Sequence, residues 1–316
     1  MMTSSPPDLH ATLARDITRA ASHQTYFTIR LLADRALKAD AYRAYAYFRW
    51  VDDVLDTVVG ARDERCAFIS RQKELLEGCF RGEIFPDITP EENLLIELAR
   101  GTREKNSGLR TYLQHMMTVM AFDADRRGRI ITQHELNQYT YHLSCAVTEA
   151  LHHFIGHNCY APHDKSRYQA VTAAHITHML RDTYDDIQAG YFNIPGEVLE
   201  SNHITPAEVQ SDAYQAWVRS RVQLARVYFR TGREYLACVQ NLRCRLAGFA
   251  YIARFESLLD AIEGDGFHLR PVYPERKGMI AILRAAGPLF ASLLFHREPL
   301  TAPDGLSAPP RTQRKS

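Results

Sequence analysis

Hydrophobic positions recur with the 3.6-residue period of an α-helix along most of the chain, from about residue 13 to residue 295. Alternation of hydrophobic and polar positions, which is typical of a strand, is hard to find in this range. Proline and glycine fall mainly between the periodic segments. Thr89 and Thr205 each precede a proline, as in helix N-caps with proline at the first helical position. The pattern predicts an all-α protein.

The periodic region contains neither a repeat of fixed length nor an obvious linker, so we predict one helical domain at residues 13–297. We predict that residues 1–12 are a flexible N-terminus. Residues 298–316 are rich in proline and end in basic residues, which predicts a disordered tail. The longest apolar run, residues 279–295, is short for a membrane span and predicts a buried or interfacial helix.

Composition places the chain among ordinary globular proteins. Of its 316 residues, 46% are hydrophobic and 24% are charged, which is enough for a sizeable core. The formal net charge of +1 argues against a nucleic-acid partner, which would require a basic face. The six cysteines form no CxxC pair and no signal-peptide pattern begins the chain, so we expect reduced thiols and a cytoplasmic location. Peripheral membrane contact, and a monomer or a homodimer, stay open.

The first of two acidic segments is YAYFRWVDDVLDTV, which contains Asp52, Asp53 and Asp56. On a helix, Tyr45, Arg49, Asp52 and Asp56 would form a polar stripe beside an apolar one. Two carboxylates at i and i+4 disfavour their own helix by roughly 0.2–0.5 kcal/mol when exposed. The segment is therefore a candidate for a bound cation.

The second acidic segment is HITHMLRDTYDDIQAGYF. Its acids are Asp182, Asp185 and Asp186, and Arg181 precedes them. On a helix, His175, His178, Asp182 and Asp186 would share one face. The two histidines lack a third ligand at a recognisable spacing, so we interpret them as pocket residues rather than zinc ligands.

If the two acidic helices face each other, their mutual repulsion requires a cation between them. Two carboxylates ~6 Å apart at an effective dielectric of ~20 repel by about 3 kcal/mol. Mg²⁺, with Mn²⁺ as an alternative, takes oxygen ligands and keeps positions for water and substrate phosphates. The pattern favours a diphosphate held by metal ions, although each segment could instead be an ordinary solvated helix face.

At these residues the sequence resembles the squalene/phytoene synthase family. RWVDDVLD is similar to the first aspartate-rich motif of that family, and LRDTYDDIQAG to the second. YTYHLSCAVTEAL resembles its central helix, with Tyr139 as the substrate-facing tyrosine. DAIEGDGFHLRPVYPERKG resembles its late segment, with Arg270 and Arg276 at basic positions. The resemblance covers roughly residues 22 to 285.

The resemblance implies a single helical bundle around a deep apolar cavity. The implied chemistry is magnesium-assisted loss of diphosphate from an allylic prenyl donor, followed by attack of a second prenyl chain to give a cyclopropyl intermediate. It implies these metal ligands: Asp52, Asp53, Asp56, Asp182, Asp185 and Asp186. The implied catalytic residues are Asp52, Asp56, Asp182, Asp186 and Tyr139. The implied substrate-binding residues are Tyr45, Arg49, His175, His178, Arg181, Arg270 and Arg276.

The sequence departs from the family pattern near the second motif. His175 and His178 replace the family's QxxN, and Tyr191 and Asn193 stand where the family has roughly RxY. A histidine in place of the family's asparagine puts one metal position in doubt. We therefore expect that the ionisation machinery is kept while the parts that handle a second prenyl chain are altered.

Three functions follow from these observations. The leading hypothesis is head-to-head coupling of prenyl diphosphates, with C15 or C20 substrates. The alternative is a terpene synthase that cyclises or hydrates one prenyl diphosphate on the same fold. A third hypothesis is a non-catalytic assembly or scaffold relative, in which loss of the acids would be expected. NADPH is not indicated, because the sequence shows no dinucleotide fingerprint.

Overall fold

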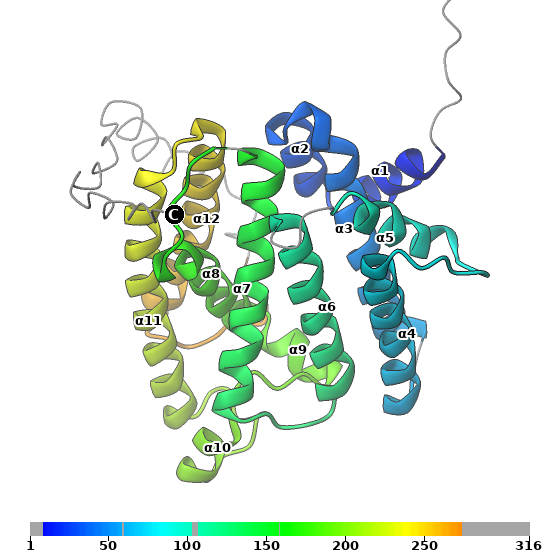
Figure 1. Ribbon diagram of the computed structural model, residues 1–316. Coiled ribbons are helices and arrows are strands. Elements are labelled where there is room, and N and C mark those ends of the chain that lie inside the picture. Colours follow the sequence, from blue (N-terminus) through cyan, green and yellow to red (C-terminus); the bar gives the residue numbers. More distant parts are fainter. Residues whose placement is uncertain (1–8, 59, 103–106, 158, 274–316) are drawn as a thin grey trace, which may run out of the picture.

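The computed structural model describes residues 9–58, 60–102, 107–157 and 159–273, and these residues form helices and loops without a strand (Figure 1). The α-helices are α1 Leu9–Ala21, α2 His23–Leu32, α3 Lys38–Asp53, α4 Arg62–Arg81, α5 Pro90–Arg100, α6 Gly108–Arg126, α7 Gln133–Gly156, α8 Gln169–Arg181, α9 Thr183–Ala189, α10 Gly196–Asn202, α11 Asp212–Cys238 and α12 Leu242–Gly264. Short 3₁₀ helices occupy Arg35–Leu37 and Lys165–Tyr168, and a π-helix occupies Val54–Val58. The predicted all-α fold is confirmed.

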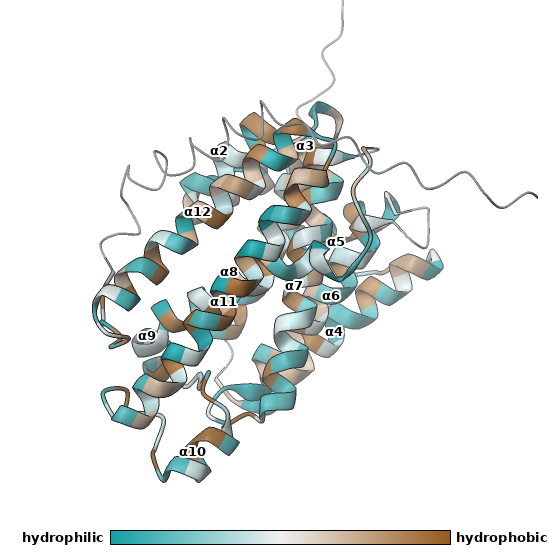
Figure 2. Cartoon of the chain, turned by 90° about the vertical axis from the view of Figure 1, so that its left-hand side faces the viewer, coloured by the Kyte–Doolittle hydropathy of each residue, from teal (hydrophilic) through white to brown (hydrophobic). Residues whose placement is uncertain are grey.

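The bundle has two hydrophobic cores that meet at α7. One core contains side chains of α1 and of α3 to α7, and the other is built mainly by α8, α11 and α12. The long helices α6 and α7 pack along each other, and α8 packs along α11 (Figure 1). Figure 2 shows hydrophobic and hydrophilic residues alternating along α8, α11 and α12, as expected for helices with one buried face.

The two threonine–proline patterns have different outcomes. Thr89 caps α5 as predicted, because its hydroxyl accepts from the Glu92 N–H and the Glu92 carboxylate accepts from the Thr89 N–H. The Glu208 carboxylate accepts from both the N–H and the hydroxyl of Thr205, yet no α-helix begins there. The chain turns instead, and α11 begins only at Asp212. The predicted helix start at Thr205 is therefore wrong.

A tertiary contact explains this turn. The Gln210 side chain donates hydrogen bonds to the Tyr184 hydroxyl and to the Leu269 carbonyl oxygen. These bonds hold the segment before α11 against two distant parts of the chain, a constraint that local capping signals do not contain.

Several predictions concern the ends of the chain. Helix α1 begins at Leu9, inside the segment predicted to be flexible, residues 1–12. The predicted apolar helix at residues 279–295 and the predicted tail at residues 298–316 lie outside the described residues. Within the described ranges, no helix is both long enough and apolar enough to span a membrane.

Candidate active site

The first acidic segment lies where α3 ends and the π-helix Val54–Val58 begins. Arg49 donates a hydrogen bond to Asp52 (Nη1–Oδ2 3.1 Å) and forms a second ion pair with Asp53. The predicted α-helical stripe is thus interrupted after Asp53, and Asp56 stands exposed in the wider π-turn. Such π-turns are frequent at functional sites because they re-aim side chains. Tyr45 lies one turn earlier on α3, partly buried against the first core.

The second acidic segment is broken at Asp182, which has φ −94° and ψ 8° and joins α8 to α9. Arg181 forms an ion pair with Asp182. His178 lies between the same groups, with Nε2 2.6 Å from Arg181 Nη2 and Nδ1 3.3 Å from Asp182 Oδ2. Asp185 is exposed on α9. The predicted single face is therefore replaced by a hinge, at which Arg181 holds the first of the three acids.

His175 and His178 lie in different environments, although we predicted a shared face. His178 is half-exposed, whereas His175 is buried with its ring centroid 5.1 Å from that of Tyr139. Burial lowers the pKa of His175 to about 3, so the imidazole is neutral. Its Nε2 atom has no hydrogen-bond partner. His175 therefore presents a neutral ring beside the tyrosine that the resemblance marks as substrate-facing.

A chain of hydrogen bonds starting on α6 connects the tyrosine with the second segment. Asp123 accepts from the Tyr139 hydroxyl (3.0 Å) and from Arg126 Nε (2.7 Å). Arg126 Nη1 donates to Asn193 Oδ1 (2.8 Å), and Asn193 Nδ2 donates to Asp186 Oδ2 (2.6 Å). The Arg126 guanidinium is buried and also lies 4.7 Å from the Tyr139 ring centroid. We call these five residues the acidic-site network.

The pKa shifts show that the two acidic segments share one electrostatic environment. Burial, with a further contribution from Asp56, raises the pKa of Asp52 to about 6. Burial, with a further contribution from Asp182, raises the pKa of Asp186 to about 7. The negative charge of Asp123 contributes to both increases, so Asp123 lies within electrostatic range of both segments. Carboxylates of both segments thus lie within electrostatic range of a partly buried third acid.

The C-terminal ends of the two segments meet at a cleft of about 500 Å³, lined by residues of the π-turn, of α9 and of the loop after α6. Arg127 joins the two ends, because it donates to the Ala189 carbonyl oxygen (3.0 Å) and to the Asp56 carbonyl oxygen (3.4 Å). The Gly128 N–H also donates to the Gly190 carbonyl oxygen (2.7 Å), and Gly190 has a φ of +86° that favours glycine. These bonds fix the distance between Asp56 and the end of α9.

The carboxylates fit magnesium, although the described ranges contain no group of three or more histidine, cysteine, aspartate or glutamate side chains arranged to hold a metal ion. Magnesium is commonly bound by only one or two carboxylates, with water and substrate phosphates completing its coordination. Partial burial and a neighbouring carboxylate raise the pKa of Asp52 and of Asp186, and a cation would relieve that repulsion. Asp53 and Asp182 have arginine partners, and Asp52 shares Arg49 with Asp53.

Of the two basic residues in the late segment, Arg270 and Arg276, the structure describes the first. Arg270 forms an ion pair with Asp265, just beyond the end of α12, and its backbone N–H donates to the Tyr273 hydroxyl. These contacts hold Arg270 at the end of α12. Arg276 lies outside the described residues.

Sequence reasoning missed three of the residues that organise the site. Asp123, Arg126 and Arg127 belong to the run AFDADRRGR, whose mixed charges resemble an exposed helix end. Asn193 was recognised only as a departure from the family pattern. A usable signal was the pairing of Asp123 with Arg126 at i, i+3, beside the aromatic Phe122, on a helix otherwise rich in apolar residues.

Comparisons with known proteins concern the family and the fold. A family model described as squalene/phytoene synthase matches residues 18–277. Phytoene synthase 3, chloroplastic, from Zea mays is 28% identical over 120 residues, which are 36% of this chain and only 28% of that protein.

Solved structures share the fold. Squalene synthase HpnC from Alicyclobacillus acidocaldarius matches with a TM-score of 0.64 and 21% identity, over 84% of this chain and 98% of that chain. A dehydrosqualene synthase in complex with ligand matches with a TM-score of 0.64 and 17% identity, over 90% of this chain and 95% of that chain. At these identities the likeness shows the fold alone.

Proposed function

Because the chain belongs to the squalene/phytoene synthase family, we propose that it is a magnesium-dependent prenyl-transferring enzyme that ionises an allylic prenyl diphosphate. The observation that carries this proposal is the meeting of the two acidic segments. Arg127 bonds the carbonyl oxygens of Asp56 and Ala189. Asp186 is joined through Asn193 and Arg126 to Asp123. Carboxylates held together at a cost in repulsion are expected where a cation binds.

The residues that would hold the metal are Asp52, Asp56 and Asp186. Bound Mg²⁺, or Mn²⁺ as an alternative, supplies positive charge that stabilises the departing diphosphate. The fold contributes the position of these carboxylates. Asn193 orients Asp186 by a hydrogen bond, and the π-turn carries Asp56 to the edge of the cleft.

Arg127 is the protein cation best placed to bind the diphosphate. It lines the cleft beside Asp56, and its hydrogen bonds go to backbone carbonyl oxygens. Among the described residues no carboxylate forms an ion pair with it, so its guanidinium keeps donor capacity for a phosphate oxygen. Arg62 lines the same cleft but is paired with Asp125.

Tyr139 acts as a positioning residue in this proposal. Its hydroxyl donates to Asp123, and its ring lies near both the Arg126 guanidinium and the His175 ring. Removing the ring would free Asp123 and Arg126 from a fixed arrangement. We therefore expect the tyrosine to act by holding the acidic-site network in place, with its ring forming part of the substrate surface.

The reaction that follows ionisation is proposed to be head-to-head coupling to a second prenyl diphosphate, with C15 or C20 chains. One observation favours the alternative, a terpene synthase acting on a single chain. The buried neutral ring of His175 occupies the position of the family's glutamine, so a polar amide is replaced by an aromatic surface beside Tyr139. A non-catalytic role is less favoured, because both sets of acids are present.

Product analysis distinguishes these functions. The purified protein is incubated with Mg²⁺ and C10, C15 or C20 prenyl diphosphates, and both diphosphate release and the hydrocarbon product are measured, with a chelator as the control. A product of two joined chains supports coupling, and a product of one chain supports the terpene synthase. Absence of magnesium-dependent diphosphate release from all three substrates would overturn the proposed function.

A further inference from the structure

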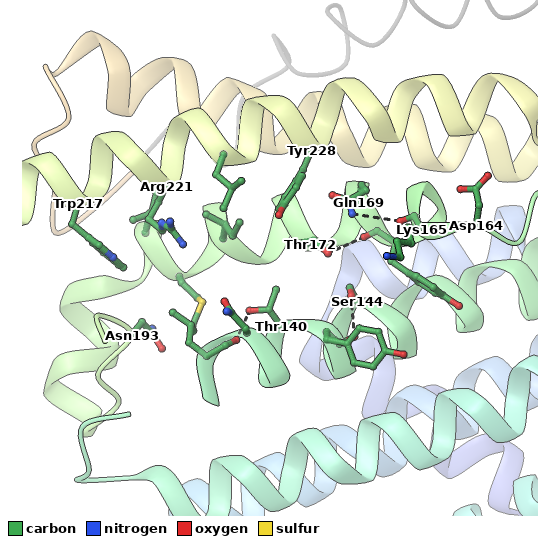
Figure 3. Close-up of a pocket in the computed structure, with 18 of the residues that line it drawn as sticks. Thr140, Ser144, Asp164, Lys165, Gln169, Thr172, Asn193, Trp217, Arg221 and Tyr228 are labelled. Carbon is green, nitrogen blue, oxygen red and sulfur yellow. Dashed lines mark hydrogen bonds between the residues drawn. The ribbon is translucent and has the colours of Figure 1, made fainter. Parts of the chain in front are cut away.

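A second cavity lies beside the acidic site, on a different side of α7 and α8. It is a groove of about 710 Å³ between α7, α8 and α11, closed at one end by the loop before α8 (Figure 3). This volume lies in the range of roughly 300–1,000 Å³ that small-molecule sites occupy. The mechanism proposed above does not use this groove.

The groove follows α11 through residues spaced at helical intervals, namely Trp217, Arg221, Leu224 and Tyr228. At 1.5 Å per residue, the span from Trp217 to Tyr228 is about 16 Å. The opposite walls are mainly aliphatic at the Arg221 end, where Leu180, Met179 and Ile176 of α8 line the groove. The groove is therefore long, narrow and largely apolar, which suits an extended hydrocarbon chain.

Two hydrogen-bond donors stand at the Trp217 end of this apolar groove. Figure 3 shows the side chains of Trp217 and Arg221 directed from α11 into the cavity. The Trp217 side chain is only 9% exposed, and its Nε1 atom has no hydrogen-bond partner. A buried N–H without an acceptor costs about 1–3 kcal/mol, so an acceptor bound at this end of the cavity would stabilise it.

Arg221 makes the end of the groove positive. Its hydrogen bond in the structure is a long contact to the neighbouring Ser220 hydroxyl (3.4 Å), and no carboxylate in the described ranges forms an ion pair with it. Burial lowers the pKa of its guanidinium, which remains charged. Partly buried cations normally have an anionic partner, because desolvation is otherwise uncompensated.

Asn193 closes the groove toward the acidic site without competing for its occupant. Its amide oxygen accepts from Arg126 and its amide nitrogen donates to Asp186, so both groups are engaged elsewhere. An anionic group at this end would therefore meet Arg221 and Trp217, and it would lie on the far side of Asn193 from the carboxylates.

We propose that this groove binds an anionic amphiphile, a molecule with one hydrocarbon chain and one negatively charged head group. The head group accepts hydrogen bonds from Arg221 and from Trp217 Nε1, and the chain lies along Leu224 and the aliphatic wall of α8. The head group is a carboxylate, as in a fatty acid, or a phosphate, as in a prenyl monophosphate. The site is separate from the one that carries the proposed function, so its test needs no turnover.

Trp217 provides the readout. The chain has two tryptophans, and Trp50 packs against Phe68 between α3 and α4. In the full-length Trp50→Phe variant, Trp217 is the single tryptophan, and its emission is followed while palmitate or farnesyl monophosphate is added without metal ions. We expect a saturable change in emission with either probe, and the probe that binds more tightly identifies the head group. Hexadecyltrimethylammonium, which has the same chain length as palmitate and the opposite charge, should give no saturable change.

The variants test the role of charge. Arg221→Gln should weaken binding at least tenfold, whereas Arg230→Gln, which removes the same charge from an exposed position of α11, should leave it within twofold. The Leu224→Trp variant should block the groove while keeping Arg221. Because this variant adds a tryptophan, its binding is measured by calorimetric titration rather than by emission. If Arg221→Gln fails to fold, loss of binding in folded Leu224→Trp still supports the site. Equal binding of the cationic probe, or equal affinities in the Arg221 and Arg230 variants, would overturn the proposal.

Discussion

The two acidic segments have the same DxxxD spacing, but the fold supports them differently. In the first, the arginine partner is local: Arg49 contacts Asp52 and Asp53 from one turn earlier on the same helix, and these three side chains are 40–50% exposed. In the second, Asp186 is held by Asn193, which is held in turn by the buried Arg126 of α6. The first segment is thus supported locally, whereas the second is supported by the core.

The largest expected effect is on catalysis. Asp186→Asn should reduce diphosphate release by about 10²–10³-fold, because it removes a carboxylate from the proposed metal site. Asp185→Asn is the matched control. It removes a carboxylate one residue away that is exposed on α9, and it should keep activity within a few-fold. Rates of prenyl diphosphate turnover at saturating Mg²⁺ check this, and equal loss in both variants would show that the whole acidic segment is required.

The next largest effect is on the free energy of unfolding, and it tests the comparison between the two acidic segments. Arg126→Met leaves the Asp123 carboxylate, which is 18% exposed, without its ion-pair partner and with the hydrogen bond from Tyr139. This should cost about 3 kcal/mol in the free energy of unfolding. Arg49→Met removes an exposed arginine and should cost about 1 kcal/mol or less.

Urea unfolding of both variants measures the difference. Similar losses would mean that the two segments are supported alike, and the contrast between a local and a core-supported segment would then be wrong.

The pH dependence of stability offers a finer test. The folded-state pKa of Asp186 is raised to about 7, while an unfolded aspartate titrates near ~4. Its contribution is therefore fully present below about pH 4 and is lost as pH rises through about 7. Without divalent cations, the stability of Asp186→Asn relative to wild type should rise over this window.

Saturating Mg²⁺ should reduce that rise, because bound metal stabilises the ionised carboxylate in the wild type. Thermal unfolding at several pH values, with and without Mg²⁺, measures both effects. A relative stability that stays constant from pH 4 to pH 8 would contradict the raised pKa.

The same contrast explains what could be predicted from the sequence. The helical fold and the pairing of Arg49 with Asp52 and Asp53 follow from periodicity and from i, i+3 and i, i+4 spacing, both of which are local. The contact between Arg126 and Asn193 joins residues 67 positions apart, and only the packed bundle brings them together.

The breaks in the acidic helices were also beyond the sequence pattern. Neither the π-turn at Val54–Val58 nor the hinge at Asp182 is marked by proline or glycine. Both breaks change which acids share a face. Periodicity therefore located the acidic segments correctly, while the identity of the side chains that meet at the site depended on the breaks.

The smallest expected effect concerns His178, which occupies the position of the family's asparagine. The imidazole lies between Arg181 and Asp182, and these two remain paired with each other when it is replaced. An amide oxygen is a better magnesium ligand than a neutral imidazole, because magnesium prefers oxygen donors. His178→Asn should therefore lower the Mg²⁺ concentration needed for half-maximal turnover by a few-fold, with little change in stability because the side chain is half-exposed.

If the altered position also governs the second prenyl chain, the products of His178→Asn should shift toward coupled chains. Titration of turnover with Mg²⁺, with product analysis at each concentration, compares the two proteins. Identical magnesium dependence and identical products would show that the second segment tolerates this replacement because Asn193 and Arg126, rather than residue 178, determine its geometry.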